Sequence, residues 1–248
     1  MPENIFERNV IKGDFSKAAS VYDEHSALQK IVREDALSLA REYFPEGAKV
    51  LDLGCGTATL AGENWDIIGA DIALGMCEMA RQKNAKIINA SADSLPFKNE
   101  SFDGVFSSLM LQWVEKPEAV FAEVLRVLKP EGVAVISTFI YGTLRELTDA
   151  FKSVDDAPHV SDFLPAEQLI MRAAHTGAVV LEVHEETHEQ GVENVRELMK
   201  SIKQIGAGNK NVQRKKGLMT RGQLARVEAA YDENIATWQV LTLVLGKS

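Results

Sequence analysis

Short apolar runs alternate with longer amphipathic segments through the first half of the chain. Five runs have the length of buried strands, namely Lys49–Leu53, Ile67–Asp71, Ile87–Ala90, Phe102–Ser107 and Val133–Phe139. Between most of them, apolar residues recur at helical spacing, notably over 75–83 and 117–128. Strands that alternate with helices form βαβ units, so the pattern predicts a doubly wound, mostly parallel α/β sheet. In such a sheet, ligands bind beyond the carboxyl ends of the strands.

The segments on either side of this alternation have a different character. A helical pattern covers about Ser16–Tyr43, before the first strand. After the fifth strand, the spacing predicts helices over 143–151, 165–175, 193–205 and 221–231, and a strand over 179–183. The last apolar stretch, Thr237–Leu245, predicts an edge strand that closes the sheet in the antiparallel direction. No repeat or low-complexity linker divides the chain, so we expect a single domain.

The composition is typical of a globular protein. Hydrophobic residues make up 46% and charged residues 25% of the 248 positions. The only two cysteines are Cys55 and Cys77, so no disulfide framework is expected. No apolar run is long enough to cross a bilayer, and the first ten residues lack the apolar core of a signal peptide. We therefore expect a cytoplasmic protein without a membrane partner.

The charge is distributed unevenly along the chain. The net charge is −9, and because a polyanion-binding protein needs a basic footprint, nucleic acid is not expected as a partner. Nine cations and one anion between Arg196 and Arg226 nevertheless give +8, which leaves −17 for the rest. This basic segment fits either a docking site for one acidic partner or a solvated helix face with a basic loop. Its cations are Arg196, Lys200, Lys203, Lys210, Arg214, Lys215, Lys216, Arg221 and Arg226.

A turn with two glycines directly follows the first strand. In residues 52–57 (DLGCGT), Gly54 and Gly56 let the backbone approach a ligand closely, at a point where a helix is expected to follow. A dinucleotide-binding loop would have a third glycine where Thr59 stands. The carboxylate of Asp52 would repel a pyrophosphate, but it is well placed for a ligand that has an ammonium group.

Two more carboxylates follow the next two strands. Asp71 lies 19 residues after Asp52, a spacing at which an acidic residue accepts hydrogen bonds from both ribose hydroxyls of an adenosine. Asp93 is placed to accept from an adenine amino group, although alone it would be interpreted as a turn or helix cap. Together the three carboxylates describe a ligand with an ammonium, a ribose and an adenine but no pyrophosphate. That ligand is S-adenosylmethionine, and no metal site is predicted.

These motifs resemble those of the class I S-adenosylmethionine-dependent methyltransferases. The first motif is VLDLGCGT at 50–57, the second is GADI at 69–72, and further matches are LPF with SFD at 95–103 and RVLKP at 126–130. Two positions depart from the pattern. Ala58 stands where many members have glycine, and Glu131 replaces the first glycine of a Pro-Gly-Gly turn.

The resemblance implies a Rossmann-like, seven-stranded sheet with added helices. The implied layout is an N-terminal helical lid (1–45), a cofactor-binding core (46–140), a helical cap or substrate region with one strand (141–236) and a closing strand (237–248). The implied cofactor-binding residues are Tyr22, Gln29, Asp52, Gly54, Cys55, Gly56, Asp71, Ile72, Met76, Ala92, Asp93, Ser94, Ser107 and Leu109.

The flanking segments resemble a narrower family, the malonyl-[acyl-carrier protein] O-methyltransferases of biotin synthesis. This resemblance runs from about Phe15 to the end of the chain. It implies methylation of the free carboxylate of malonyl-acyl-carrier protein, with the acidic carrier docking on residues 196–226. The segments that carry it are 15–19, 22–23, 28–29, 111–113, 137–139, 142–147, 158–159, Phe163, 202–207 and 218–221.

The implied reaction suits a chain without an evident catalytic dyad. A malonyl carboxylate is already ionised at neutral pH, so its oxygen needs no general base. Catalysis then depends on alignment and desolvation, while the carboxylate itself needs a cation or hydrogen-bond donors. Gln112 and Trp113 are expected to border the transferred methyl group. The alternative is that Gln112 is a surface amide and Trp113 packs in the core. The substrate-positioning candidates are Gln112, Trp113, Arg145, His159, Lys200 and Arg221.

Three other interpretations remain open from the sequence. A class I enzyme that methylates a free small molecule, such as a quinone precursor or a small acid, would share the core and leave the basic segment unused. A nucleic-acid methyltransferase is disfavoured, because SSLM at 107–110 replaces the Asn/Asp-Pro-Pro-aromatic element of that class. A binding protein without turnover is disfavoured by the intact carboxylates and glycines.

Overall fold

The structure is a computed structural model that describes residues 8–20, 22, 26–57, 60, 62–83, 85–205, 207, 209, 219–232 and 234–247. Its helices are α1 (Arg8–Ala18), α3 (Ala27–Tyr43), α4 (Leu74–Gln82), η1 (Leu111–Trp113), α5 (Pro117–Val127), α6 (Arg145–Lys152), α7 (Ala166–His175), α8 (Val195–Gln204) and α9 (Arg221–Ala230). Its strands are β1 (Lys49–Leu53), β2 (Asp66–Asp71), β3 (Lys86–Asn89), β4 (Phe102–Ser108), β5 (Leu128–Phe139), β6 (Val179–Gly191) and β7 (Ile235–Gly246). Within these ranges, no helix combines the length and the apolar character that a membrane crossing requires.

The described strands form one seven-stranded sheet in the order β3-β2-β1-β4-β5-β7-β6. Strands β1 to β5 pair in parallel, and β7 runs antiparallel to both β5 and β6. This confirms the predicted doubly wound sheet and its antiparallel closing strand. The prediction of β7 as an edge strand was wrong, because β6 pairs along its outer side from Val179 to Gly191. The nearly continuous burial of β7 is typical of an interior strand.

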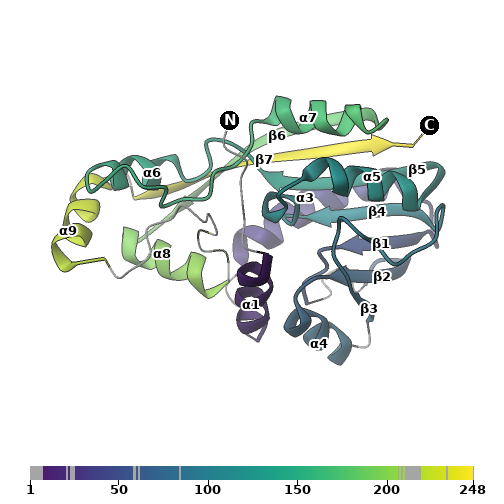
Figure 1. The fold of residues 1–248 in the computed structure, drawn as a ribbon, viewed down its shortest axis with the longest axis horizontal. Coiled ribbons are helices and arrows are strands. Elements are labelled where there is room, and N and C mark those ends of the chain that lie inside the picture. Colours follow the sequence, from purple (N-terminus) through teal and green to yellow (C-terminus); the bar gives the residue numbers. More distant parts are fainter. Residues whose placement is uncertain are drawn as a thin grey trace.

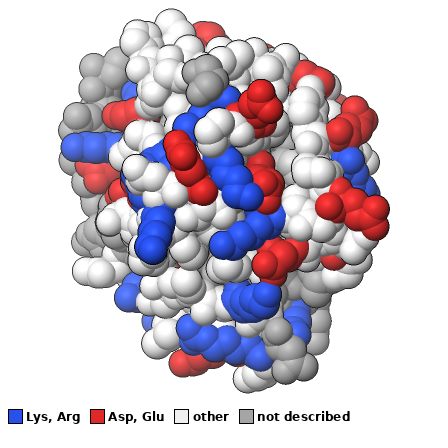
Figure 2. Space-filling model, turned by 90° about the vertical axis from the view of Figure 1, so that its right-hand side faces the viewer, with Lys and Arg blue, Asp and Glu red and all other residues white. Residues whose placement is uncertain are grey.

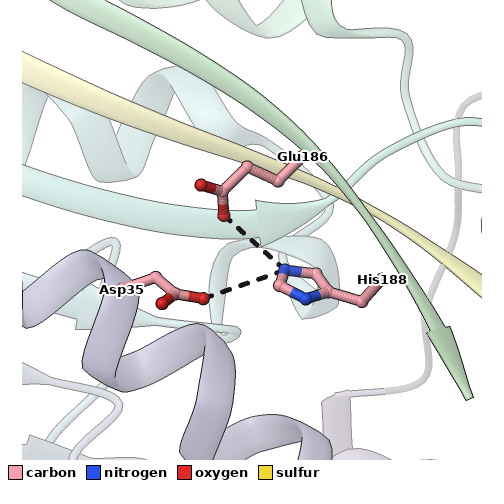
Figure 3. Close-up of side chains that lie close together, drawn as sticks. All are labelled: Asp35, Glu186 and His188. Atoms are coloured by element: carbon pink, nitrogen blue, oxygen red, sulfur yellow. Dashed lines mark ion pairs between the residues drawn. The ribbon is translucent and has the colours of Figure 1, made fainter.

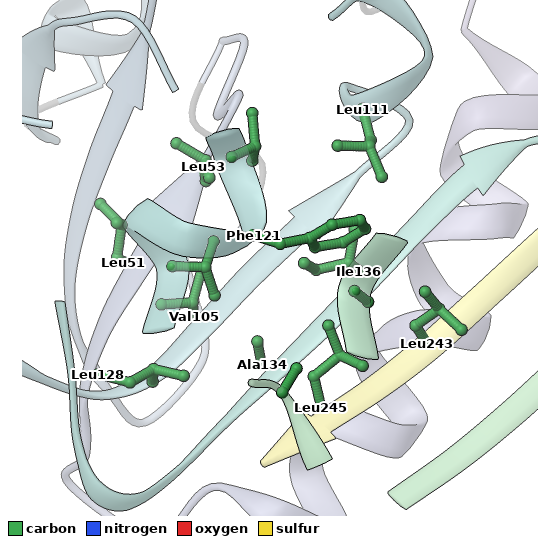
Figure 4. Close-up of a cluster of buried hydrophobic side chains, with 14 of the residues drawn as sticks. Leu51, Leu53, Val105, Leu111, Phe121, Leu128, Ala134, Ile136, Leu243 and Leu245 are labelled. Atoms are coloured by element: carbon green, nitrogen blue, oxygen red, sulfur yellow. The ribbon is translucent and has the colours of Figure 1, made fainter. Parts of the chain in front are cut away.

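Hydrophobic layers cover both faces of the sheet. On one face, α3 buries Ala36 against Phe106 of β4 and Val135 of β5. On the other face, α5 and α7 enclose a larger cluster in which the Phe121 ring lies among strand residues such as Ile136 (Figure 4). Full burial of such a side chain contributes about 1.5–3 kcal/mol, so the two layers hold the strand ends in fixed positions.

Several element boundaries differ from the sequence prediction. The pattern over Ser16–Tyr43 does not form one continuous helix, since α1 ends at Ala18 and α3 begins at Ala27. Strand β6 continues past Val183, because an edge strand held by backbone pairing with β7 needs no apolar alternation. The turn after β1 was expected to lead into a helix, but residues 60 and 62–65 form turns and bends.

Helices α6, α8 and α9 lie together at one end of the molecule, beyond the carboxyl ends of the parallel strands (Figure 1). We call this group of helices the cap. Leu147 of α6, Leu198 of α8 and Val227 of α9 belong to one buried cluster with Trp238 of β7. The cap therefore has a small core of its own, built on the extension of β7 past the end of β5.

Candidate active site

A cleft opens at the carboxyl ends of β1, β2 and β4, where the topology predicts ligand binding. It encloses about 950 Å³, counting space open to solvent at its mouth. The loops after these strands form most of its wall, with Met76 of α4 on one side and Ile11 and Phe15 of α1 on another. We call it the main cleft.

The glycine turn after β1 forms the floor of the main cleft. Gly54 has a φ of +75°, and a Cβ atom there would lie 2.4 Å from Cγ of Met110. Gly54 is therefore required both by its backbone conformation and by the close approach of Met110. Gly56 also has a positive φ, +53°, but a Cβ atom there would meet open space. This leaves the backbone of Gly56 bare toward the cleft.

Asp71, at the end of β2, holds the glycine turn in place. Its Oδ2 accepts a hydrogen bond from the Gly56 N–H at 3.0 Å, and its Oδ1 accepts one from the Ala73 N–H at 2.7 Å. Burial raises the pKa of the Asp71 carboxyl, while backbone donors at Ala73, Gly56 and Ile72 favour the charged form and oppose the rise. Each oxygen keeps a second lone-pair position, so Asp71 can also accept hydrogen bonds from ligand hydroxyls.

Asp52 lies beneath the turn and is only 4% exposed. Burial raises the pKa of its carboxyl to about 7, the Asp71 charge adds to the rise, and the charge of Arg33 in α3 opposes it. Nε of Arg33 is itself buried and has no hydrogen-bond partner among the described residues. The site thus holds a carboxylate and a guanidinium that influence each other electrostatically, with at least one donor of the guanidinium unused.

The loop after β3 places Asp93 in the lining of the cleft, and hydrogen bonds from α5 hold this loop. Ser91 Oγ donates to Asp93 Oδ1 at 2.6 Å. Arg126 of α5 donates to the Leu95 carbonyl oxygen at 3.0 Å and pairs with Glu123, whose carboxylate accepts from the Leu95 N–H. The Arg126 position of the RVLKP motif therefore supports the cleft without lining it.

Helix α1 forms a roof over the main cleft. Ile11, Phe15 and Tyr22 line the cleft from this side. The Phe15 ring meets the edge of Trp113 in η1, with 5.5 Å between ring centroids. At the other end, the Gly75 N–H of α4 donates to Ser16 Oγ at 3.2 Å, and a Cβ atom at Gly75 would lie 2.5 Å from the Ser16 carbonyl oxygen. The roof is thus seated on α4 and on η1.

Most of the predicted cofactor-binding residues line this one cleft. The side chain of Leu109 does so from a left-handed backbone conformation with a φ of +52°, a strained geometry that is common at functional sites. The predicted residues in the lining are Tyr22, Gly54, Gly56, Asp71, Ile72, Met76, Ala92, Asp93 and Leu109.

The other five predicted cofactor residues lie outside the lining. Asp52 is beneath the turn, and the buried Cys55 thiol fills space beside Gly69, where burial raises its pKa and keeps it protonated. Ser107 Oγ donates to the Leu53 carbonyl oxygen at 2.8 Å and joins β4 to β1. Ser94 forms a β-bridge with Ser91, and Gln29 lines a separate pocket.

That separate pocket lies under the cap and adjoins the main cleft. Trp113 lines both cavities, so it forms a shared wall. The pocket, which we call the cap pocket, is mostly apolar, with Phe151 of α6, Met199 of α8 and Trp238 of β7 in its walls. His159 also lines it. Its ring stacks on Phe151 with centroids 4.0 Å apart, and its Nε2 lies 2.7 Å from Asp155 Oδ1.

A third cavity, the outer groove, lies on the far side of Gln112. The Gln112 amide donates to the Leu109 carbonyl oxygen at 2.7 Å and accepts from Thr138 Oγ1 at 3.0 Å. This side chain joins the ends of β4 and β5 and lines the outer groove with the exposed Tyr141. It is neither a free surface amide nor part of the lining of the main cleft.

The three cations proposed from the sequence lie away from both the main cleft and the cap pocket. Arg145 is exposed, pairs with Glu146 and borders a surface hollow on the opposite side of α6. Lys200 pairs with Glu197 at 3.2 Å on the exposed face of α8. Arg221 is exposed at the start of α9. Of the six substrate-positioning candidates, only Trp113 and His159 therefore reach these two cavities.

Sequence reasoning missed several residues of the site. The sequence could have singled out Arg33. It lies four residues after Gln29 and four before the buried Leu37, on one face of an amphipathic helix, and a cation is unexpected on a buried helix face. Met110 and Trp238 carry no such signal, since each reaches its cavity only through long-range packing. Glu131 is a different case. Its φ of +64° explains why glycine is usual there, and it lies far from the cleft lining.

One other side-chain cluster joins α3 to the sheet edge (Figure 3). His188 Nε2 lies 3.6 Å from Glu186 Oε2 on the same strand, β6, and 4.0 Å from Asp35 Oδ2 on α3. Among the described residues this is the one group of three potential metal ligands, and it lies outside the three cavities. The Tyr43 hydroxyl at the end of α3 donates to Glu182, so α3 contacts β6 at a second point.

Comparisons with known proteins agree with this geometry. Residues 51–136 match a family described as a methyltransferase domain. The malonyl-[acyl-carrier protein] O-methyltransferase of Serratia marcescens is 36% identical over 231 residues, which is 90% of this chain and 88% of that protein. The biotin biosynthesis bifunctional protein BioHC of Cellvibrio japonicus is 34% identical over 257 residues, 97% of this chain and 50% of that protein.

The fold is also shared with solved structures of low sequence identity. The YcgJ protein of Bacillus subtilis is 16% identical and superposes with a TM-score of 0.61, covering 86% of this chain and 98% of that one. The sheet order, the cleft at the strand ends and the family match define a class I methyltransferase, an enzyme that uses a methyl donor of the S-adenosylmethionine type. The chain belongs to the malonyl-[acyl-carrier protein] O-methyltransferase family, so the family resemblance predicted from the sequence is confirmed.

Proposed function

We propose that this protein transfers a methyl group from S-adenosylmethionine to the free carboxylate of malonyl-acyl-carrier protein, an early step of biotin synthesis. Relatives named for this reaction and for this pathway support the proposal. The structural observation that carries it is the arrangement of Asp52, Asp71 and Asp93 around one cleft, which suits a donor with no phosphate.

Each polar part of the donor has a matching group, either in the lining of the main cleft (Asp71 and Asp93) or buried beneath its glycine turn (Asp52, with Arg33 acting on it electrostatically). Asp71 accepts from the ribose hydroxyls and Asp93 from the adenine amino group. Asp52, which has no cation in hydrogen-bond contact among the described residues, pairs with the donor's ammonium group. Arg33, with its unused Nε–H, is the matching cation for the donor's α-carboxylate. The amino-acid group of the donor carries one positive and one negative charge, so it provides a partner of opposite charge for both Asp52 and Arg33.

The reaction requires the protein mainly to align the methyl donor with the acceptor carboxylate. When bound, the donor supplies a methyl group on a sulfonium, and a carboxylate oxygen forms the new O–C bond as the C–S bond breaks, with no proton transferred. Trp113 lies where the main cleft meets the cap pocket, so it borders the path between donor and acceptor.

The test is a comparison of three acceptors with a donor labelled in its methyl group. The purified protein is given malonyl-acyl-carrier protein, malonyl-coenzyme A or free malonate, and the methyl ester is measured. The proposal expects turnover on malonyl thioesters and almost none on free malonate. Turnover on free small acids alone would replace it with a small-molecule methyltransferase.

The division of the chain is also part of this proposal. Residues 1–45 act as a lid through α1, residues 46–140 bind the donor, residues 141–236 form the substrate cap, and residues 237–248 close the sheet. The lid role is supported by the contacts of Ile11, Phe15 and Tyr22 with the main cleft, and by the seating of Ser16 on Gly75.

Gly75→Ala is expected to weaken donor binding about tenfold with little change in unfolding free energy, because overpacking of about 1–3 kcal/mol falls on the lid contact. The new Cβ atom would meet the Ser16 backbone and push α1 off its seat. Calorimetric titration with S-adenosylmethionine measures the affinity. Gly13→Ala in α1 is the matched control, since a Cβ atom there has no neighbour within 4 Å. Equal affinity in both variants would remove α1 from donor binding.

The docking site for the carrier is proposed on the basic segment, residues 196–226. Lys210, Arg214, Lys215 and Lys216 lie outside the described residues. Of the others, Arg196 pairs with Glu228, while Lys203, Arg221 and Arg226 are exposed. On the face shown in Figure 2, at the amino ends of the parallel strands, Lys and Arg are interleaved with Asp and Glu. That face has no single sign of charge to attract an acidic carrier.

Reversing Arg214, Lys215 and Lys216 to glutamate should raise the apparent KM for malonyl-acyl-carrier protein and make turnover less sensitive to salt. Charges at a docking surface act mainly on association, and salt screens them over about 8 Å at physiological ionic strength. Donor affinity and turnover of a carrier-free malonyl thioester should stay nearly unchanged. Equal loss on both acceptors, or loss on neither, would exclude this segment as the dock.

A further inference from the structure

Trp238, which lines the cap pocket, carries a buried hydrogen-bond donor that has no partner among the residues that the structure describes. The residue is 6% exposed, and the donor is its indole Nε1–H. Leaving such a donor unpaired costs the desolvation of the group without any hydrogen bond in return. Buried polar groups are rarely left in this state without a functional reason. The donor is therefore expected to meet an acceptor that enters the pocket.

The lining of the cap pocket indicates what kind of acceptor it is. Most of the described wall residues are aliphatic or aromatic, and the polar side chains among them are Gln29, His159, Ser161 and Asn209. Among the residues that the structure describes, neither this lining nor that of the main cleft includes a lysine or an arginine. A small acyl group with carbonyl oxygens fits such a lining.

The position of the pocket relates it to methyl transfer. Trp113 lines both this pocket and the main cleft, and the Trp238 ring packs against Phe139 at the end of β5, with centroids 5.2 Å apart. An acyl group in the cap pocket would therefore lie next to the main cleft at Trp113, within a pocket that Trp238 also lines.

We propose that the cap pocket is the acyl subsite and that Trp238 Nε1–H donates a hydrogen bond to an oxygen of the malonyl thioester. This inference rests on the proposed function and names the residue that holds its substrate. A neutral donor also suits the chemistry. It orients the acyl group without the strong ion pair that an arginine would form, so the attacking carboxylate keeps more of its nucleophilicity, and its charge is balanced by the methyl donor.

The first experiment compares Trp238→Phe with Trp65→Phe. Phenylalanine keeps an aromatic ring and removes only the N–H donor and part of the ring volume, while Trp65 packs on Phe44 in another cluster. Binding of malonyl-pantetheine is measured by calorimetry with S-adenosylhomocysteine present, beside KM and kcat for malonyl-acyl-carrier protein. Trp238→Phe should weaken acyl binding and raise KM about tenfold, as expected for one lost buried hydrogen bond. Affinity for S-adenosylmethionine should not change in either variant.

A second variant tests the subsite independently of the indole. Met199→Trp should fill the cap pocket from α8 and abolish malonyl-pantetheine binding, while Tyr141→Ala in the outer groove should leave it unchanged. Normal acyl binding in Met199→Trp, or loss in Tyr141→Ala, would place the acyl group in the outer groove instead. Normal acyl binding in Trp238→Phe would exclude the indole as the donor. A native enzyme that neither binds nor methylates malonyl thioesters would overturn the proposed function itself.

Discussion

Asp71→Ala is expected to weaken S-adenosylmethionine binding roughly 30- to 1,000-fold, because two charge-assisted hydrogen bonds contribute on the order of 2–4 kcal/mol. The same carboxylate also anchors Gly56 and Ala73 through their N–H groups. The variant therefore loses the proposed ribose contact and the anchor of the glycine turn together. Calorimetric titration measures the affinity, and methyl transfer should fall in parallel at donor concentrations that saturate the native enzyme.

A conservative variant separates the two roles of Asp71. Asp71→Asn has one carbonyl oxygen, so it can keep one backbone anchor and lose charge assistance to the ribose. We expect an intermediate loss of affinity and a smaller loss of unfolding free energy than in Asp71→Ala. An Asp71→Ala protein that binds the donor with native affinity would refute the ribose assignment.

Asp52→Asn is expected to stabilise the donor-free protein above pH 7 and to weaken donor binding by about 10- to 150-fold, the value of one charged hydrogen bond of 1.5–3 kcal/mol. Asp52 is buried in the folded protein, and this raises the pKa of its carboxyl from 3.8 to about 7. A shift of that size corresponds to a cost on the order of 4 kcal/mol for keeping the folded protein charged at this position. Under the proposed function, the charge is retained at that cost because Asp52 pairs with the donor's ammonium group.

The sign of the pH dependence follows from the direction of this shift. The folded state holds the Asp52 proton more tightly than the unfolded state, so this group's contribution to stability is lost as pH rises from about 4 to 7 and is constant above. The free energy of unfolding, measured in urea at pH 5 and at pH 8, should therefore fall less between these two pH values in Asp52→Asn than in the native chain. Equal declines in the two proteins would mean that Asp52 is not the group responsible.

Donor binding should show the opposite trend below neutrality. Binding requires a charged Asp52, so affinity is expected to rise up to about tenfold per pH unit until about pH 7. It should decline again above about pH 8, where an α-amino group of ordinary pKa, about 7.7–8.0, loses its proton. In Asp52→Asn, donor affinity should no longer rise with pH below about pH 7. Its decline above about pH 8 should remain but be weaker than in the native protein.

Local sequence pattern was sufficient for the strands of the core and for much of the main cleft. β1 to β4 were predicted to within one or two residues, because buried parallel strands are short apolar runs with turns at both ends. Gly54, Gly56, Asp71 and Asp93 line the main cleft as the sequence predicted, because the cleft opens at the sheet edge where residues immediately after strands lie. The sequence pattern did not predict which strand lies at the edge of the sheet. An apolar run cannot reveal whether β7 has a neighbour on its outer side, and that neighbour is the polar strand β6.

The sequence by itself determined the fold class, the carboxylates of the main cleft and the family, since each is encoded in residues close together along the chain. Only the tertiary structure decided how the acceptor side is built. It directed Arg145 and Lys200 to solvent, fixed Gln112 between β4 and β5, and brought Arg33 near Asp52. It also placed Trp238 beside a cavity shared with residues more than 100 positions earlier. Such contacts depend on the packing of α3, the cap and β7 around one another, and long-range packing leaves no local signal in the sequence.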